Sequence, residues 1–73
     1  MKWTFARGDD WEGLYIDDIL IEQGHSLSPE WAARQAIITP PSKVDVREVD
    51  FNWLDNEGWL PDNLTGVKWH ETD

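Results

Sequence analysis

At residues 14–21 the chain reads Leu-Tyr-Ile-Asp-Asp-Ile-Leu-Ile, with two acidic residues between two short apolar runs. A break of two residues between apolar runs is the spacing of a tight β-hairpin. The central residues of such a turn need a positive φ, which Asp tolerates better than most residues. The segment therefore predicts strands at residues 11–16 and 19–23, joined at Asp17-Asp18, with Gly24 ending the second strand.

A further strand is predicted ahead of this hairpin. Residues 2–7 alternate, so that Trp3, Phe5 and Arg7 share one side of an extended chain. Gly8-Asp9-Asp10 follows as a turn signal. Together with the hairpin, this pattern predicts an antiparallel meander of three strands.

A helix is expected after the meander. Ser28-Pro29-Glu30 is typical of a helix start, because Ser caps free N–H groups, Pro fits the first helical position, and Glu favours the positive end of the helix dipole. The helix is expected to continue to about Ile37. Pro40-Pro41 prevents its continuation, because Pro lacks the N–H that a helix interior requires.

Residues 43–53 are interpreted as a fourth strand. Val44 and Val46 share one phase of alternation, and Val49 begins the opposite phase. Because a slip of one residue sends every later side chain to the other face, a bulge or bend is expected at Arg47-Glu48.

The remaining chain is rich in Asp, Asn, Gly and Pro. Residues 54–66 are expected to form a loop with one helical turn near residues 60–64, and residues 67–70 a short final strand or an anchored tail. The fold class expected is α+β, in one domain of residues 1–73. A twisted antiparallel sheet, made of the three-stranded meander plus the fourth strand, is expected in the order β-β-β-α-β, with one helix on one face and the other face partly exposed.

The composition narrows the function. Fifteen acidic residues against six basic ones give a formal charge of −9, which disfavours direct binding to nucleic acid or to an anionic membrane surface. There is no cysteine, so disulfides and thiolate metal sites are excluded. No secretory signal and no apolar run long enough for a membrane span is visible, so the expected location is the cytoplasm.

Six tryptophans are the second compositional signal. Each buries roughly 150–250 Å² when enclosed, so indole packing is expected to stabilise this small body in place of cross-links. Trp3, Trp11 and Trp31 are expected in the core. Trp53 and Trp59 flank an acidic loop and are assigned equally to core and interface, since Trp is favoured at binding hot spots.

The leading functional expectation is a non-enzymatic module that binds a protein with a basic surface. No catalytic residue, cofactor or metal ligand is assigned. The contact residues are expected on the hairpin turns and on the late acidic loop: Asp9, Asp10, Glu12, Asp17, Asp18, Trp53, Asp55, Glu57 and Trp59.

Two alternatives stay open. An uncovered sheet face would allow a homodimer that acts as an accessory or ligand-sequestering protein. A small metal protein or enzyme would use His25 with nearby acids, such as a zinc site that also recruits His70. Ser26 is adjacent to His25 and would point to the opposite face of an extended chain, which disfavours a nucleophile–base pair.

Two short stretches of the chain carry a resemblance. Gly8-Asp9-Asp10-Trp11-Glu12-Gly13-Leu14-Tyr15, followed by Glu22-Gln23-Gly24-His25-Ser26-Leu27, resembles a pattern of small uncharacterised acidic proteins of bacteria and their phages. The two stretches cover about a fifth of the chain, and the resemblance carries no activity or site residue with it. The resemblance implies a phage or mobile-element origin, and hence an inhibitor of host defence enzymes that mimics DNA, as anti-CRISPR and anti-restriction proteins do.

Overall fold

The first part of the chain forms the predicted meander. The structure is a computed structural model that describes residues 1–70. Strands β1 (Lys2–Arg7), β2 (Glu12–Ile16) and β3 (Ile19–Gly24) pair antiparallel in sequence order. Asp17 adopts φ 55° in the β2–β3 turn and accepts a hydrogen bond from the Lys2 N–H at 3.1 Å. The expected turn at Asp17-Asp18 is therefore confirmed.

Helix α1 (Pro29–Ile38) follows the meander. Ser28 is its N-cap with φ −64° and ψ 132°, and its hydroxyl accepts a hydrogen bond from the Trp31 N–H. Thr39 ends the helix one residue before the two prolines. The predicted helix start is thus confirmed, although no residue of α1 is fully buried.

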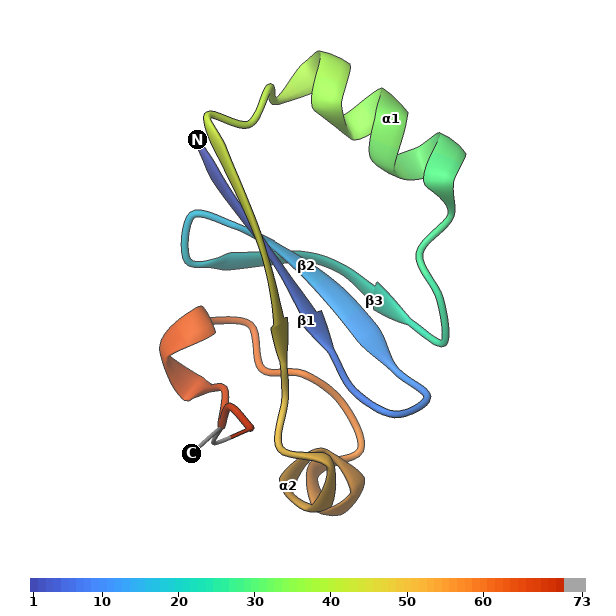
Figure 1. Ribbon diagram of the computed structural model, residues 1–73, viewed down its shortest axis with the longest axis vertical. Coiled ribbons are helices and arrows are strands. Elements are labelled where there is room, and N and C mark those ends of the chain that lie inside the picture. Colours follow the sequence, from blue (N-terminus) through green and yellow to red (C-terminus); the bar gives the residue numbers. More distant parts are fainter. Residues whose placement is uncertain (71–73) are drawn as a thin grey trace.

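The fourth strand differs from the prediction. Strand β4 (Lys43–Glu48) pairs with β1, and the pairing is parallel, so the sheet is mixed with the order β3-β2-β1-β4. The connection of residues 25–42 carries α1 across the sheet and returns the chain in the direction of β1, as a helical crossover does. Figure 1 shows β4 beside β1, with α1 beyond the end of the sheet where β4 begins.

A second helix replaces the end of the expected strand. Helix α2 (Phe51–Glu57) begins after Asp50, whose carboxylate accepts a hydrogen bond from the Trp53 N–H at 3.0 Å. Gly58 ends the helix with φ 82°, a left-handed conformation that glycine adopts without strain. The phase change at Arg47-Glu48 therefore marks the end of a strand. The irregularity in the sheet lies elsewhere, between Leu14 and Tyr15 against β3.

The last described residues form a strap. A short 3₁₀ helix, η1 (Leu64–Gly66), stands near the predicted helical turn. Of the two alternatives for residues 67–70, the anchored tail is found, held by an isolated antiparallel bridge between Val49 and Trp69 and by packing of Trp69 against the core. The element order is therefore β-β-β-α-β-α, an α+β fold that ends in a strap of residues 59–70.

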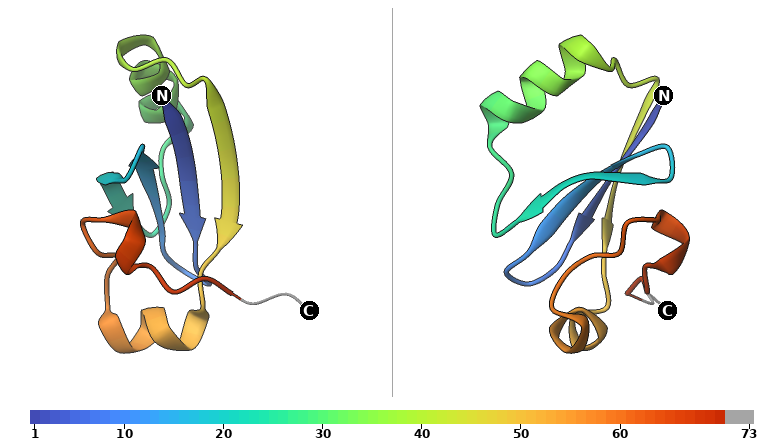
Figure 2. Two further views of the ribbon diagram at one scale, coloured as in Figure 1. Left: turned by 90° about the vertical axis from the view of Figure 1, so that its left-hand side faces the viewer. Right: turned by 180° about the vertical axis from the view of Figure 1, so that it is seen from behind.

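The face opposite α1 is covered by α2 and the strap, which corrects the expectation that this face would be partly exposed. The partly open face is the one that carries α1, where Val44 and Val46 are largely exposed. Trp3, Leu14 and Ile16 form a buried cluster on the α1 side, against Trp31 and other partly buried residues. The larger cluster lies on the opposite face, where α2 and the strap pack (Figure 2). It contains Ala6, Tyr15, Val49, Leu54, Leu60 and Val67.

The tryptophans divide as follows. Trp3 is buried as expected, whereas Trp11 and Trp31 are only partly buried and pack against the two clusters. Trp53 is partly buried against the larger cluster, and Trp59 is 65% exposed. Indoles therefore contribute to both clusters, and one of the two tryptophans left open by the sequence lies at the surface.

The larger cluster predicts a loss of stability in alkali. Burial, followed by the negative charge of Asp62, raises the pKa of the Tyr15 phenol from 10.0 to about 12. Between these values the unfolded chain releases the proton while the folded chain keeps it, so stability falls as pH rises. A shift of about 2 units corresponds to a loss of about 2–3 kcal/mol by pH 12. Urea unfolding at pH 9 and pH 11.5 measures it.

The matched control is Tyr15→Phe, which removes the ionising group. This variant also loses the hydrogen bond that the Tyr15 hydroxyl donates to the Pro61 carbonyl, so it starts about 1 kcal/mol less stable. Its further loss between pH 9 and 11.5 should be clearly smaller. An equal alkaline loss in both proteins would contradict the assignment to Tyr15.

Candidate functional site

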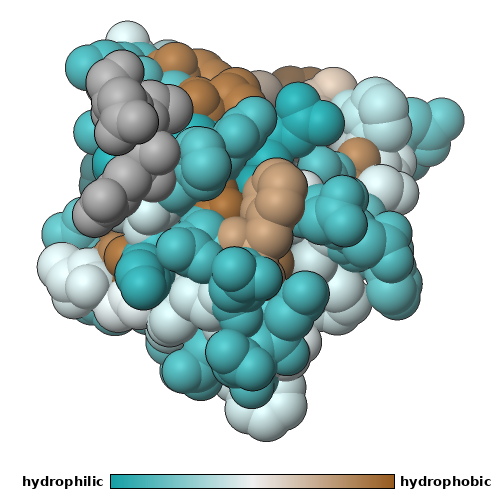
Figure 3. Space-filling view, turned by 60° about the horizontal axis from the view of Figure 1, so that its bottom comes forward, coloured by the Kyte–Doolittle hydropathy of each residue, from teal (hydrophilic) through white to brown (hydrophobic). Residues whose placement is uncertain are grey.

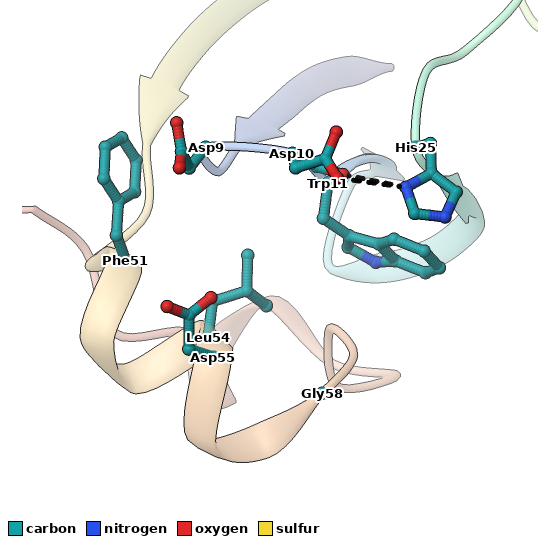
Figure 4. Close-up of a pocket in the computed structure, with 8 residues that line it drawn as sticks. All are labelled: Asp9, Asp10, Trp11, His25, Phe51, Leu54, Asp55 and Gly58. Carbon is teal, nitrogen blue, oxygen red and sulfur yellow. Dashed lines mark hydrogen bonds and ion pairs between the residues drawn. The ribbon is translucent and has the colours of Figure 1, made fainter.

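A hollow of about 200 Å³ lies between the β1–β2 loop and α2. Figure 4 shows the loop facing the helix across it, with the segment after β3 closing one side. Figure 3 shows that hydrophilic residues cover most of the surface at this end of the molecule. The lining residues are Asp9, Asp10, Trp11, His25, Phe51, Leu54, Asp55 and Gly58.

Close packing holds the loop in place. The Gly8 N–H donates to the Trp11 carbonyl at 2.7 Å and so closes the turn that carries Asp9 and Asp10. A Cβ atom at Gly8 would overlap the Leu54 side chain, so the loop and α2 touch at this point. The absence of a side chain at Gly8 thus allows one wall of the hollow to approach the other.

The aromatic wall is fixed by hydrogen bonds. The Trp11 indole Nε1–H donates to Gln23 Oε1 at 2.9 Å. The His25 ring contacts Trp11 edge-to-face, with centroids 5.0 Å apart and an interplanar angle of 78°. His25 Nδ1 lies 3.2 Å from the Asp10 carbonyl oxygen and 3.5 Å from its carboxylate. His25 therefore contacts the turn that carries Asp10 and the Trp11 ring beside it.

Helix α2 supplies the opposite wall. Phe51 and Asp55 are four residues apart, so they lie on the same side of the helix. Within residues 1–70, neither Asp9 nor Asp55 has a cationic group within 4.0 Å. The hollow thus combines three carboxylates with two aromatic rings, Trp11 and Phe51. Carboxylates attract cations, and aromatic faces bind them through the ring quadrupole.

Three of the predicted contact residues meet here, namely Asp9, Asp10 and Asp55. Glu12 follows Asp9 and Asp10 closely in sequence, but its carboxylate contacts other groups of the same chain. Its carboxylate accepts from the Leu27 N–H at 2.6 Å and lies 3.9 Å from Arg7 Nε. Glu12 is therefore a structural residue that ties the segment after β3 to β2.

The other predicted residues lie outside the hollow. Asp17 and Asp18 are exposed in the β2–β3 turn, at the other end of β2 from Asp9 and Asp10. Glu57 is exposed at the end of α2, and Trp53 packs toward the core. Trp59 is exposed and follows Gly58 in the chain, but it is not one of the residues that line the hollow.

Phe51 and Leu54 were not anticipated as site residues, because residues 50–58 were interpreted as strand and loop. A signal for the helix was present. Asp50 is a favourable N-cap and Gly58 a favourable helix end, and these two residues bracket seven residues without proline.

A second hollow is lined by Arg47, Glu48, Trp69 and His70. Arg47 lies over the Trp69 ring at 4.1 Å, so the basic group and the aromatic face of this hollow already engage each other in a cation–π contact. His25 and His70 line different hollows. Over residues 1–70 no group of three or more His, Cys, Asp or Glu side chains is placed to hold a metal ion.

The same part of the chain has no helix with the length and apolar character needed to cross a membrane. No protein-family model matches the chain, and no curated protein or solved structure is detectably similar to it.

Proposed function

We propose that the protein is a non-enzymatic interaction module that binds the basic surface of another protein and seats a Lys or Arg side chain in the hollow between the β1–β2 loop and α2. The observation that carries this proposal is that Asp9, Asp10 and Asp55 line one hollow together with the aromatic residues Trp11 and Phe51 (Figure 4). These elements are distant in sequence and meet only in the folded chain.

The whole-molecule charge supports the same partner class. With a formal charge of −9, the protein attracts a basic surface over long range and repels nucleic acid. Charges of this kind mainly speed association and make it sensitive to salt. Trp59 adds an exposed indole to the surface, and Trp is among the residues that most often anchor protein interfaces.

The finer proposal is a phage-type inhibitor that acts in the cytoplasm on a nucleic-acid-binding host protein. Its support is the acidic surface together with the resemblance at residues 8–15 and 22–27 to small acidic bacterial and phage proteins. The carboxylates at the two turns would stand for phosphates on the host protein's basic surface. Competition between this protein and DNA for one host protein, lost at high salt, is the outcome that supports this finer proposal.

A double substitution tests the hollow directly. Asp9→Asn with Asp55→Asn keeps side-chain volume and removes two of its three carboxylates. We expect the affinity for a short Lys- and Arg-containing peptide to fall about tenfold, or about 1.4 kcal/mol, since each partly exposed ion pair contributes about 0.2–1 kcal/mol. Titration followed by the Trp11 indole N–H signal in NMR spectra measures the affinity at the site itself.

The matched control is Asp17→Asn with Asp18→Asn. It changes the net charge equally at the far end of the β2–β3 hairpin, and Asn tolerates the φ of 55° found at Asp17. This control should lower the affinity for the peptide by less than about threefold. Equal weakening by both pairs would show that net charge binds the peptide and would contradict the role of the hollow.

A further inference from the structure

We infer that a second copy of this chain pairs with the first along the outer edge of β4, antiparallel and about a two-fold axis through Val44. The proposal does not depend on the proposed function. The axis lies where β4 begins, whereas α2 lies beyond the point where β4 ends (Figure 1). α2 forms one wall of the hollow that carries the proposed function, so a dimer of this kind would leave that hollow open in each copy.

The edge of β4 presents apolar side chains beside unpaired backbone. β4 is the last strand of the sheet, so one side of it has no strand partner. Val44 and Val46 pair with Trp3 and Phe5 in the β1 register, so they lie on the face that α1 partly covers. Four aliphatic side chains near this edge are largely exposed: Ile37 at 82%, Ile38 at 75%, Val44 at 51% and Val46 at 60%.

The strap limits how much of the edge is open. The His70 N–H donates to the Glu48 carbonyl at 2.9 Å, and the Asp50 N–H donates to the Lys68 carbonyl at 2.9 Å. These bonds place residues 68–70 alongside the end of β4. Among the described residues nothing pairs in this way with residues 43–47, so a partner strand must bind there.

Symmetry and charge then select one register. Opposite residues in an antiparallel pair share a face, so a continuous two-fold sheet requires one residue to lie on the axis. An axis at Asp45 would place that carboxylate against its own copy and Lys43 against Arg47, which is repulsive. An axis at Val46 would place Val44 of the second copy opposite Glu48, where His70 already binds.

An axis at Val44 avoids both conflicts. It places Lys43 of each copy opposite Asp45 of the other, which makes two attractive pairs beside a central pair of valines. Asp45 lies 3.3 Å from Lys2 Nζ of the neighbouring strand β1, so Lys43 of the second copy would approach this carboxylate from the opposite, open side of β4. Within residues 1–70 Lys43 has no acidic group within 4.0 Å.

The same axis brings the exposed aliphatic residues together. α1 joins β4 through residues 39–42, so Ile37 and Ile38 lie at the end of the molecule where the axis stands. Two copies would gather the isoleucines and valines of both chains on one face. Burial of this surface is the main favourable term for the dimer, at about 25 cal/mol per Å² of apolar area.

Single cysteines test the register, since the chain has no cysteine of its own. With the axis at Val44, the two Cα atoms of residue 44 lie about 4.5–5.5 Å apart, within the range for a disulfide. The two copies of residue 46 are then about 13 Å apart along the strands. We expect Val44→Cys to form a disulfide dimer under mild oxidation and Val46→Cys, the matched control, to form little. Equal cross-linking at both positions, or none at residue 44, would overturn the register.

Charge reversal gives an independent readout by sedimentation equilibrium at physiological ionic strength. Lys43→Glu places two acidic pairs at the interface and should weaken the dimer at least fivefold. Asn52→Asp with Asn56→Asp on the exposed side of α2, beyond the other end of β4, changes the net charge equally and should weaken the dimer less than twofold. Adding Asp45→Lys to Lys43→Glu restores opposite charges and should recover most of the affinity. A wild-type chain that stays monomeric at millimolar concentration would refute the dimer.

Discussion

Replacement of Gln23 by leucine is expected to lower the free energy of unfolding by about 3 kcal/mol. Gln23 Oε1 accepts hydrogen bonds from the Trp11 indole at 2.9 Å and from the Leu60 N–H at 2.7 Å. Its Nε2 donates to the Leu60 carbonyl at 3.2 Å. Leucine has nearly the same volume but satisfies none of these groups, and each buried group left unpaired costs about 1–3 kcal/mol.

The expected loss is large for this chain. A domain of this size has a total stability of about 4–11 kcal/mol. Because Gln23 joins β3 to the start of the strap, we also expect faster amide exchange at Leu60 and a shifted Trp11 indole signal. Urea unfolding and NMR spectra of the variant measure both effects.

Gln35→Leu is the matched control. Gln35 is half-buried in α1, and its Nε2 donates to the Thr39 hydroxyl at 3.3 Å near an exposed helix end. Water can replace that bond, so the expected loss is below about 1 kcal/mol. Equal losses of unfolding free energy in the two variants would contradict the stabilising role assigned to the hydrogen bonds that Gln23 makes with Trp11 and Leu60.

The second large effect is expected for Leu60→Ala, at about 3 kcal/mol. Leu60 is 1% exposed in the cluster between the sheet and the strap. A Cβ atom at Gly13 of β2 would lie 2.5 Å from Leu60 Cδ1, so the leucine packs directly against the strand backbone. Truncation removes this contact and leaves a cavity that the neighbouring strand fills poorly.

Leu64→Ala provides the comparison, because Leu64 is a partly buried leucine of the same strap. Its expected loss is about 1 kcal/mol, since water can reach part of the site. A loss as large as that of Leu60→Ala would contradict the assigned difference in packing.

A double-mutant cycle sharpens this prediction. Gly13→Ala alone should destabilise the protein, because its Cβ would overlap Leu60. In the Leu60→Ala background the same Cβ enters the space that the leucine leaves. The double variant should therefore lose less unfolding free energy than the sum of the losses of the two single variants. Simple additivity would show that the two residues do not touch in solution.

Several features of the fold follow from residues close together in sequence. The apolar runs around Asp17-Asp18 predicted the β2–β3 hairpin, and Asp17 adopts the positive φ that such a turn requires. Ser28-Pro29-Glu30 predicted the start of α1, which the structure confirms. In both cases the deciding interactions join residues within a few positions, so local chemistry is sufficient.

The direction of β4 needed more than local chemistry. Alternation at Val44 and Val46 indicated a strand but not its neighbour, and a continued antiparallel sheet was expected. The connection of residues 25–42 contains a helix and is long enough for a crossover. A connection of this length and kind is typical of parallel strands. Pairing with β1 is then decided by which sheet edge the returning chain reaches.

Helix α2 shows how two local signals compete. The spacing of Val49, Phe51 and Trp53 indicated a strand, whereas Asp50 and Gly58 are typical helix ends. Burial decides between them, because the helix places Leu54 against the same sheet face as Ala6 and Tyr15. That contact joins residues far apart in sequence, so no short window of the chain contains it.

The sequence alone determined the acidic surface, the hairpin and the capped helix, because these depend on composition and on neighbouring residues. It also supplied Asp9, Asp10 and Asp55 as separate candidates. Only the tertiary structure decided that these three carboxylates share one hollow with Trp11 and Phe51. The physical reason is that the hollow exists where the β1–β2 loop meets α2, and the packing of the whole strap against the sheet sets that meeting point.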